Sequence, residues 1–278
     1  MNVYEVVTKR ILDRLEEGNI APWQKMWSGN KAFGQPTNLV TGKPYRGMNR
    51  IILACSGFNS NHYMTFNQAK AIGATVNKGE KGFPVIFWKK IEDDVKDDEY
   101  FLLRYYTVFN IDQISGIPAS KLPVVNVDKD FNGIAIADGI LASNVIPKVT
   151  YGGDKACYSP DLDKIMLPNK TDFKSVEAYY ETAFHEAVHS TGHESRLNRD
   201  IRNLFGSHKY SCEELIAEIG ASFLMAECRI ENKAILENQV SYLKCWLKAL
   251  KDHPKMIIQA SGKAQKAVDL ILGRTVTA

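Results

Sequence analysis

The sequence predicts an α+β fold, in which helices and strands occupy largely separate stretches of a 278-residue chain. Apolar residues recur at helical spacing between positions 3 and 17 and again around position 185. Two runs rich in aromatic and β-branched residues lie between these helices, at 83–88 and 100–109. A hydrophobic content of 45% is enough for a full core, and the length allows two domains.

The boundary between the two expected domains lies near the middle of the chain. Residues 111–130 contain Pro118 and Pro123 and lose periodicity, which is typical of a linker. We therefore expect a mixed α/β first domain at 1–125 and a second domain at 126–278.

The first domain is expected to begin with a helix at 3–17, whose charged residues lie opposite its apolar face. Residues 19–50 contain repeated Pro and Gly residues and two tryptophans, which indicates an ordered, irregular loop layer. Two short helices are predicted at 49–56 and 65–73, the second with Thr65 as its N-cap.

The two β-rich runs are expected to pair as a hairpin. The segment 92–99 would form its exposed tip, since six of these eight residues are Asp or Glu. Such a tip repels a phosphate backbone, so a surface that binds polyanions should lie away from it.

The second domain is expected to open with a helix from about 131 to 143 and to close with two amphipathic, structural helices near 232–252 and 255–272. Its central helix should begin after Thr171 or Ser175 and end at Gly192. Short strands of a small antiparallel sheet are predicted around 147–151, 156–158 and 165–168.

The central helix carries the motif His185-Glu186-Ala187-Val188-His189. Histidines four residues apart lie one turn along the same helix face, so both imidazoles can reach one metal ion. Glu186 stands beside them, where a carboxylate can act as a base. A three-histidine version of this motif would place its third histidine at position 195, which is Ser195. His193 comes two residues early, so a surface or supporting role is favoured for it.

The third protein ligand is expected on a helix at 211–225, whose apolar residues alternate with acids. Glu214 and Glu218 lie on one face of that helix, where acids are costly unless they are paired or bound. We predict Glu214 as the ligand and Glu218 as the group that orients a histidine, with Glu213 facing solvent. The choice between Glu214 and Glu218 is open at this point, and the alternative is that both acids only cap helices or form salt bridges.

These residues together predict a zinc site of the gluzincin type, although another divalent metal would also fit. Zinc held by His185, His189 and Glu214 would activate water, and Glu186 would take the proton as the water attacks a peptide carbonyl. Tyr210 is one candidate donor to the oxyanion. The strand at 165–168 would offer its edge to the substrate backbone.

The first half of the chain has a second pattern, a basic and aromatic surface. Between Asn19 and Ile91 there are ten Lys or Arg residues and a single acid, Glu80. Aromatic rings interleaved with cations are what single-stranded nucleic acid requires, because bases stack on rings while cations track phosphates. The alternative for the tryptophans is that they only pin the loop to the core. The residues predicted to bind DNA are Trp23, Trp27, Lys31, Lys43, Tyr45, Arg46, Asn49, Arg50, Lys78 and Lys81.

The five cysteines have no C-x-x-C spacing, so we expect buried free thiols in a reducing compartment. The N-terminus reads as an amphipathic helix rather than a signal peptide, and no run approaches the roughly 18 apolar residues of a membrane span. The sequence therefore predicts a soluble, cytoplasmic protein without a membrane partner.

Several longer motifs support a family resemblance that covers nearly the whole chain. They are Ala21-Pro22-Trp23-Gln24, Thr41-Gly42-Lys43, Thr65-Phe66-Asn67-Gln68-Ala69, Val76-Asn77-Lys78-Gly79-Glu80-Lys81-Gly82, His189-Ser190-Thr191-Gly192-His193 and Glu213-Glu214-Leu215-Ile216-Ala217-Glu218. In these motifs the sequence resembles the ArdC-type antirestriction proteins of conjugative plasmids and related mobile elements. It departs from the pattern at Cys212, where we expect Ala, and at Ser190, where an aromatic residue is frequent; neither change touches the chemistry.

The resemblance implies an N-terminal domain that binds single-stranded DNA and a C-terminal zincin-like metallopeptidase domain, with a role in shielding incoming DNA from restriction. The alternative is a DNA-binding protective protein whose metal domain is structural or inactive as a peptidase. Glu186 favours catalysis, because a purely structural site does not need it. A third alternative, a peptidase whose basic part binds acidic proteins, is separable by salt-dependent binding to oligonucleotides. Neither the protein substrate nor the oligomeric state follows from the sequence.

Overall fold

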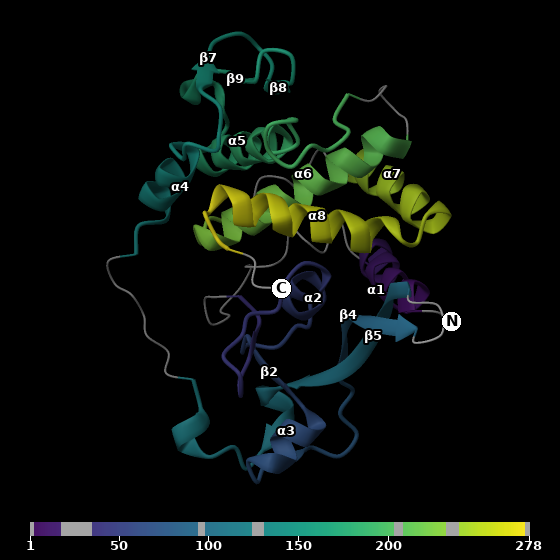
Figure 1. Cartoon of the computed structure of the whole chain (residues 1–278). Coiled ribbons are helices and arrows are strands. Elements are labelled where there is room, and N and C mark those ends of the chain that lie inside the picture. Colours follow the sequence, from purple (N-terminus) through teal and green to yellow (C-terminus); the bar gives the residue numbers. More distant parts are fainter. Residues whose placement is uncertain are drawn as a thin grey trace.

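The computed structural model describes residues 3–17, 35–93, 98–123, 131–202, 208–231 and 239–275. Figure 1 shows helices α4 to α8 with a small sheet at the top, and a larger sheet with helices α2 and α3 below them. Helix α1 (Val3–Glu17) confirms the predicted first helix and contacts α7 and α8 as well as strand β5. The α+β fold class is confirmed.

The larger sheet has the strand order β1-β2-β5-β4. Its strands are β1 (Thr37–Asn38), β2 (His62–Thr65), β4 (Phe83–Asp93) and β5 (Asp98–Asn110). The last two form the predicted hairpin, paired antiparallel in continuous register from Phe83–Val108 to Asp93–Asp98. The strands extend further than predicted, because the ladder uses backbone groups that acidic residues also carry. Only 94–97 lie between them.

Two short helices lie beside this sheet at the predicted places, α2 (Met48–Ala54) and α3 (Phe66–Ala71). Thr65 caps α3 as predicted. Its Oγ1 accepts a hydrogen bond from Gln68 N at 3.1 Å, while Gln68 Oε1 accepts one from Thr65 N at 2.9 Å. The remaining short elements are β3 (Thr75–Val76), which pairs with β6 (Ile114–Ser115), and the 3-10 turns η2 (Ile111–Gln113) and η3 (Ala119–Lys121).

The small sheet at the top of Figure 1 has the order β7-β9-β8. Its central strand β9 (Lys164–Leu167) pairs parallel with β7 (Val149–Tyr151) and antiparallel with β8 (Cys157–Ser159). The prediction that 165–168 offers a free edge to substrate is wrong, because both edges of β9 are already paired. An edge belongs instead to β8, which contacts helix α5.

The helices of the second half agree with the predicted order. They are α4 (Gly133–Leu141), α5 (Val176–Ser190), α6 (His208–Glu227), α7 (Gln239–Asp252) and α8 (Met256–Ile271), with the 3-10 turn η4 (Lys170–Asp172) before α5. Helices α5 and α6 pack closely at Gly220. A Cβ there would lie 2.7 Å from Val188 Cγ2, so glycine permits the approach. Ala217 and Ala221 are buried in the same contact region.

One apolar core runs through both parts of the molecule. Val7 of α1 and Ile51 of α2 are fully buried in the same cluster as Phe184 of α5, Leu215 of α6 and Val268 of α8. The first helix therefore packs on helices from the end of the chain. A domain boundary between residues 125 and 126 stays a prediction.

None of the helices in the described ranges is both long and apolar enough to cross a membrane.

Candidate metal centre

Helix α5 positions the two histidines of the central motif. Its N-cap is Ser175, whose Oγ accepts a hydrogen bond from Ala178 N at 3.1 Å. Phe184 and Val188 are fully buried and anchor one face of the helix in the core. His185 and His189 lie at the border of this face, and their Nε2 atoms are 3.0 Å apart. The spacing of four residues therefore brings both imidazoles to one point.

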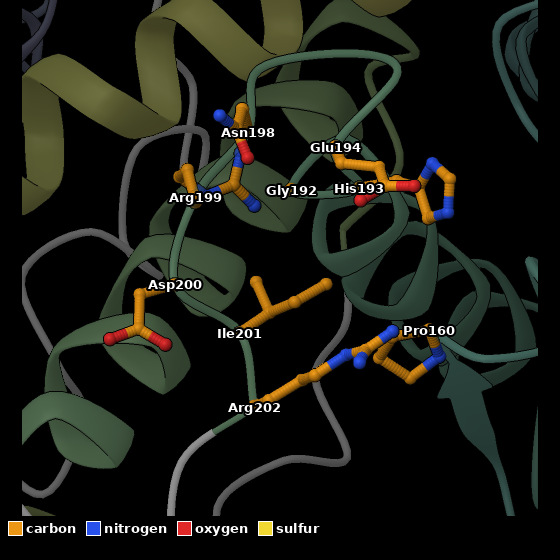
Figure 2. Close-up of a pocket in the computed structure, with 9 residues that line it drawn as sticks. All are labelled: Pro160, Gly192, His193, Glu194, Asn198, Arg199, Asp200, Ile201 and Arg202. Carbon is orange, nitrogen blue, oxygen red and sulfur yellow. The ribbon is translucent and has the colours of Figure 1, made fainter.

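The loop after α5 lines a pocket of about 240 Å³ (Figure 2). Its lining residues are Pro160, Gly192, His193, Glu194, Asn198, Arg199, Asp200, Ile201 and Arg202. Arg199 is engaged within the protein, since it donates to Thr191 Oγ1 at 2.7 Å and to Val188 O at 2.8 Å. Arg202 pairs with Asp161 at 2.8 Å. These arginines therefore stabilise the loop, and the pocket does not include the two motif histidines.

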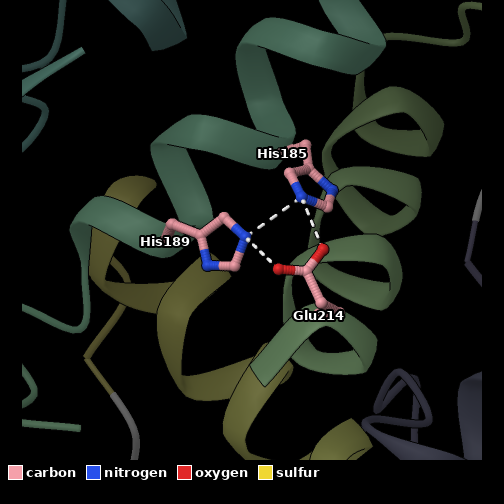
Figure 3. Close-up of side chains that lie close together, drawn as sticks. All are labelled: His185, His189 and Glu214. Carbon is pink, nitrogen blue, oxygen red and sulfur yellow. Dashed lines mark hydrogen bonds and ion pairs between the residues drawn. The ribbon is translucent and has the colours of Figure 1, made fainter. Parts of the chain in front are cut away.

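Glu214 of helix α6 completes a cluster with the two histidines (Figure 3). Its Oε2 lies 3.6 Å from His185 Nε2, and its Oε1 lies 3.6 Å from His189 Nε2. One ligand atom from each residue falls within 4.8 Å of the others. Two imidazole nitrogens and a carboxylate oxygen that converge in this way form a donor set that suits zinc and similar divalent ions.

The charges around His185 are strongly coupled. Burial alone would lower the pKa of His185, but the contact with the carboxylate of Glu214 and the charges of Glu218 and Glu186 raise it to about 9. Burial raises the pKa of Glu214, and its contacts with the two histidines outweigh that effect, so the pKa is lowered. The side chains at this point therefore form a concentrated negative environment that attracts a cation.

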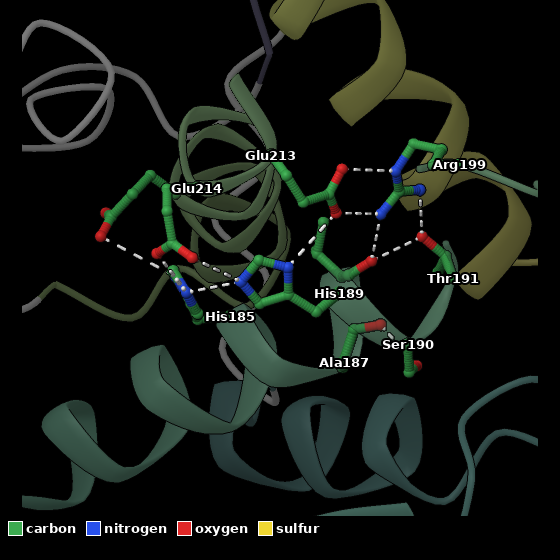
Figure 4. Close-up of polar contacts among 10 residues, drawn as sticks. His185, Ala187, His189, Ser190, Thr191, Arg199, Glu213 and Glu214 are labelled. Carbon is green, nitrogen blue, oxygen red and sulfur yellow. Dashed lines mark hydrogen bonds and ion pairs between the residues drawn. The ribbon is translucent and has the colours of Figure 1, made fainter. Parts of the chain in front are cut away.

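Glu213 contradicts the prediction that it faces solvent. It is buried, and its Oε1 accepts a hydrogen bond from His189 Nδ1 at 3.2 Å (Figure 4). Arg199 donates to both carboxylate oxygens of Glu213, at 3.0 and 2.8 Å. When the Nδ1–H of His189 donates to Glu213, the lone pair of His189 Nε2 is directed into the cluster. The loop after α5 brings Arg199 to this place, and helical periodicity carries no signal for such a contact.

Three other residues predicted from the sequence, Glu218, Tyr210 and His193, differ in how closely they approach the cluster. Glu218 Oε1 is 3.8 Å from His185 Nδ1, which is longer than a hydrogen bond. Tyr210 donates its hydroxyl to Glu214, which helps to lower the pKa of that carboxyl. His193 Nδ1 accepts from Ser195 Oγ at 2.8 Å and lies outside the cluster.

Glu186 lies close to both the histidine pair and the small sheet. It is only 8% exposed. Its charge contributes to the raised pKa of His185 and, after burial, to the raised pKa of Cys157 on strand β8. The carboxylate is thus near the cluster and near an edge strand. Cys55, Cys157, Cys212 and Cys228 are free thiols, and Cys157 is exposed, so the expected burial is wrong for it.

The residues predicted to bind DNA fall into three groups. Trp23, Trp27 and Lys31 lie outside the described residues. Lys43, Lys78 and Lys81 are exposed. The remaining four, Tyr45, Arg46, Asn49 and Arg50, make contacts within the protein.

These inward contacts hold the sheet and the helices together. Asn49 forms two hydrogen bonds with the backbone of Ile86, at 2.7 and 2.8 Å. Arg46 pairs with Asp269 while its side chain remains 41% exposed. Tyr45 is buried, and burial raises its pKa to about 12.

Arg50 is 2% exposed and pairs with Glu227 at 3.1 Å. Its guanidinium lies 4.5 Å from the ring centroid of Phe223. Burial lowers the pKa of Arg50 to about 10, against the opposing charge of Glu227. A buried cation paired in this way joins the first part of the chain to α6.

Two family models match the chain. Residues 1–109 match the N-terminal domain of the anti-restriction factor ArdC, and residues 136–263 match a zincin-like metallopeptidase. Two proteins described as DNA primase TraC from Escherichia coli are 37% and 36% identical, each over 97% of this chain. The chain spans only 20% and 27% of their length.

Relatives of similar length are also found. The uncharacterised protein y4eC of Sinorhizobium fredii (strain NBRC 101917 / NGR234) is 31% identical over 96% of this chain and 91% of its own. The crystal structure of the antirestriction ArdC protein from the R388 plasmid with Mn(II) bound has a TM-score of 0.79 and 34% identity, over 98% of both chains. The metal-free form has a TM-score of 0.76 and 35% identity, over 98% of this chain and 97% of that one.

Proposed function

Since this chain belongs to the ArdC-type family of antirestriction proteins, we propose that it binds single-stranded DNA and hydrolyses a protein substrate at a divalent metal. Its role would be to shield the incoming DNA of a mobile element from restriction. The observation that carries the hydrolytic part is the cluster of His185, His189 and Glu214, with Glu186 beside it. The zincin-like domain match agrees with this proposal.

The three cluster residues fit a divalent metal by their chemistry. Two neutral imidazoles and one carboxylate leave a position open for water, as catalytic zinc sites do. We favour Zn²⁺, and the same donors accept Mn²⁺, which is bound in the related R388 structure. When bound there, the ion acts as a Lewis acid that polarises a carbonyl and makes water a stronger nucleophile.

The side chains around the cluster supply the remaining steps. Glu186 accepts a proton from the attacking water and passes it to the leaving amine. Glu213 and Arg199 hold His189 in the orientation that directs Nε2 to the cluster. Strand β8, an edge strand of the described sheet in contact with helix α5, would align a substrate backbone in place of 165–168.

The hydrolytic proposal is tested by replacing Glu186 with Gln. The variant should bind one equivalent of Zn²⁺ like the wild type but lose at least about 100-fold in the cleavage rate of labelled, unfolded casein. Glu194→Gln, at an exposed position of the next loop, is the matched control and should cleave normally. A wild-type protein that binds metal and cleaves nothing would instead support the DNA-protective alternative, with a structural metal.

The DNA-binding proposal rests on the exposed cations of the first part of the chain, Lys43, Lys78 and Lys81. Trp23, Trp27 and Lys31 belong to the same proposal on the strength of the sequence alone. Binding to an oligonucleotide should fall with salt, by a slope of roughly 0.7 for each phosphate contact with a single strand. Replacing the three lysines with Gln should lower that slope. The matched triple variant at exposed Lys148, Lys174 and Lys266 should leave it unchanged.

A further inference from the structure

Strands β4 and β5 carry exposed aromatic residues that were not among those predicted to bind DNA. Phe87 is 41% exposed and Tyr106 is 40% exposed, and their ring centroids are 5.7 Å apart. The register places Arg104 opposite Phe87 and Tyr106 opposite Val85, so all of them share one face of the hairpin. Arg104 is also exposed. Phe87, Arg104 and Tyr106 are called the hairpin face below.

The opposite side of the same hairpin is different. Ile86 and Leu103 turn into the main core, with Leu103 only 6% exposed. Trp88 and Tyr105 stand on this side and are 53% and 50% exposed. Neighbouring residues along one strand therefore carry exposed rings on two different faces, which provides matched pairs for substitution.

The hairpin face is held from beneath by the core. The hydroxyl of Tyr106 lies near that of Tyr45, and Tyr45 is buried against Tyr63 with ring centroids 6.3 Å apart. Val85, opposite Tyr106, is fully buried. Tyr106 thus stands beside a packed core and against Phe87, while its ring remains accessible. A ring that is already ordered loses little conformational entropy when a flat group stacks on it.

The charges beside the rings are positive. Tyr45, which contacts Tyr106, lies between Lys43 and Arg46 in the chain, and both side chains reach solvent. Glu80, the sole acid between residues 19 and 91 of the sequence, accepts a hydrogen bond from Gln113 at 2.7 Å. Rings bordered by cations complement a chain of bases and phosphates, and of these cations Arg46 also pairs with Asp269.

We propose that the hairpin face is a stacking platform for the bases of single-stranded DNA, with Arg104 pairing to a phosphate or lying over a base. This proposal rests on the proposed function and names the surface that would perform its DNA-binding part. Base stacking on aromatic side chains is sequence-tolerant because every base has a flat face. The last pairs of the hairpin ladder, Glu92–Glu99 and Asp93–Asp98, are acidic and repel phosphates, so the bound strand leaves the platform toward Lys43.

The test compares adjacent residues on opposite faces. Binding of a fluorescein-labelled oligo(dT) to the full chain is measured by anisotropy at low salt. Tyr106→Ala and Phe87→Ala should each weaken binding by about 5- to 150-fold, the range for one stacked base. Tyr105→Ala and Trp88→Ala should change it less than about twofold, since their rings stand on the other face. Tyr106→Phe, which keeps the ring, should bind within about twofold of the wild type.

Each outcome decides between the proposals. If the wild type binds and the Phe87 and Tyr106 variants bind equally well, the platform is wrong while DNA binding by the chain stands. If the wild type does not bind, both fail. A wild type that forms dimers, lost only in the Phe87 and Tyr106 variants, would identify the face as a contact between copies and overturn the platform. Arg104→Gln folds without loss of a buried group and should lower the salt slope of binding by roughly 0.7.

Discussion

The metal centre and the hairpin face hold their side chains in contrasting ways. At the metal centre His189 bonds to Glu213, Glu213 bonds to Arg199, and Arg199 bonds to the backbone of Val188. On the hairpin face the rings stand 40–41% exposed and contact each other, with centroids 5.7 Å apart. When one member of a buried charge network is removed, its partners lose their hydrogen bonds and the substitution effects are not additive. Exposed rings make few shared contacts, so their effects are nearly independent. Substitutions should therefore cause coupled, non-additive effects at the first site and nearly additive effects at the second.

The largest effect is expected from removing a histidine of the cluster. His189→Ala removes a ligand atom and leaves the buried carboxylate of Glu213 paired with Arg199 but no longer with an imidazole. Metal affinity should fall by more than the roughly 100-fold that removing an outer partner of a ligand causes. Zinc content after dialysis, measured by atomic emission, checks this result. His193→Ala is the matched control, since His193 lies outside the cluster; retention of one zinc by His189→Ala would refute the assignment.

Glu213→Gln should give the next largest effect. The carboxamide still accepts a hydrogen bond but no longer carries the charge that Arg199 and His189 share. Metal affinity should fall by about 10- to 100-fold, measured by competition with a chelating dye. Glu218→Gln is the comparison, because Glu218 lies 3.8 Å from His185 and its effect should be smaller. A larger loss with Glu218→Gln would assign the orienting role to Glu218, as the sequence prediction had it.

The site residues that were predicted are positioned by local helix geometry, whereas those that were missed are positioned by tertiary packing. His185 and His189 meet because of one helix turn, and Glu214 lies where the helical pattern of 211–225 puts it. Glu213 meets His189 because Gly220 lets α6 approach α5 and because a loop folds Arg199 back over both. The approach of the two helices is a tertiary property, which the spacing of residues along the sequence does not predict.

The fold shows the same division. The hairpin and the capped helix at Thr65 follow from local pattern and agree with the prediction. Strand β9 is central because it pairs with β8 on one side and with β7 on the other. Strand order is a tertiary property, so the sequence prediction assigned the edge to the wrong strand. Composition likewise gave a basic, aromatic region, while packing decides that Arg50 points into the core and Tyr106 outward.

The pH dependence of the metal centre should separate it from the hairpin face, which has no histidine between residues 83 and 110. The pKa of His185 is raised to about 9 without metal, and a histidine must be neutral to bind an ion. Apparent zinc affinity should therefore rise about tenfold per pH unit from pH 7 toward 9. Oligonucleotide binding should change little over this range. Isothermal titration in two buffers also measures the released proton; a flat profile would contradict the coupling.

The same pKa predicts the stability of the metal-free protein. A histidine whose folded pKa lies above its unfolded value of about 6.5 stabilises the fold fully below pH 6.5. This contribution, on the order of 3 kcal/mol, is lost as the pH rises through about 9. Urea unfolding of metal-free protein should show decreasing stability from pH 6.5 to 9.5. His185→Gln is the control and should remove most of the slope; an unchanged slope in that variant would place its origin elsewhere.

The smallest effect on stability is expected from truncating a ring of the hairpin face. Its size decides whether weaker DNA binding by such a variant can be assigned to lost stacking. Phe87→Ala should lower the free energy of unfolding by about 1 kcal/mol, through its exposed ring and its contact with Tyr106. Val85→Ala, two residues earlier on the same face and fully buried, should cost about 2 kcal/mol. Urea midpoints measure both. If Phe87→Ala destabilises the protein as much as Val85→Ala, its ring is part of the core, and weaker DNA binding by that variant could not be assigned to lost stacking.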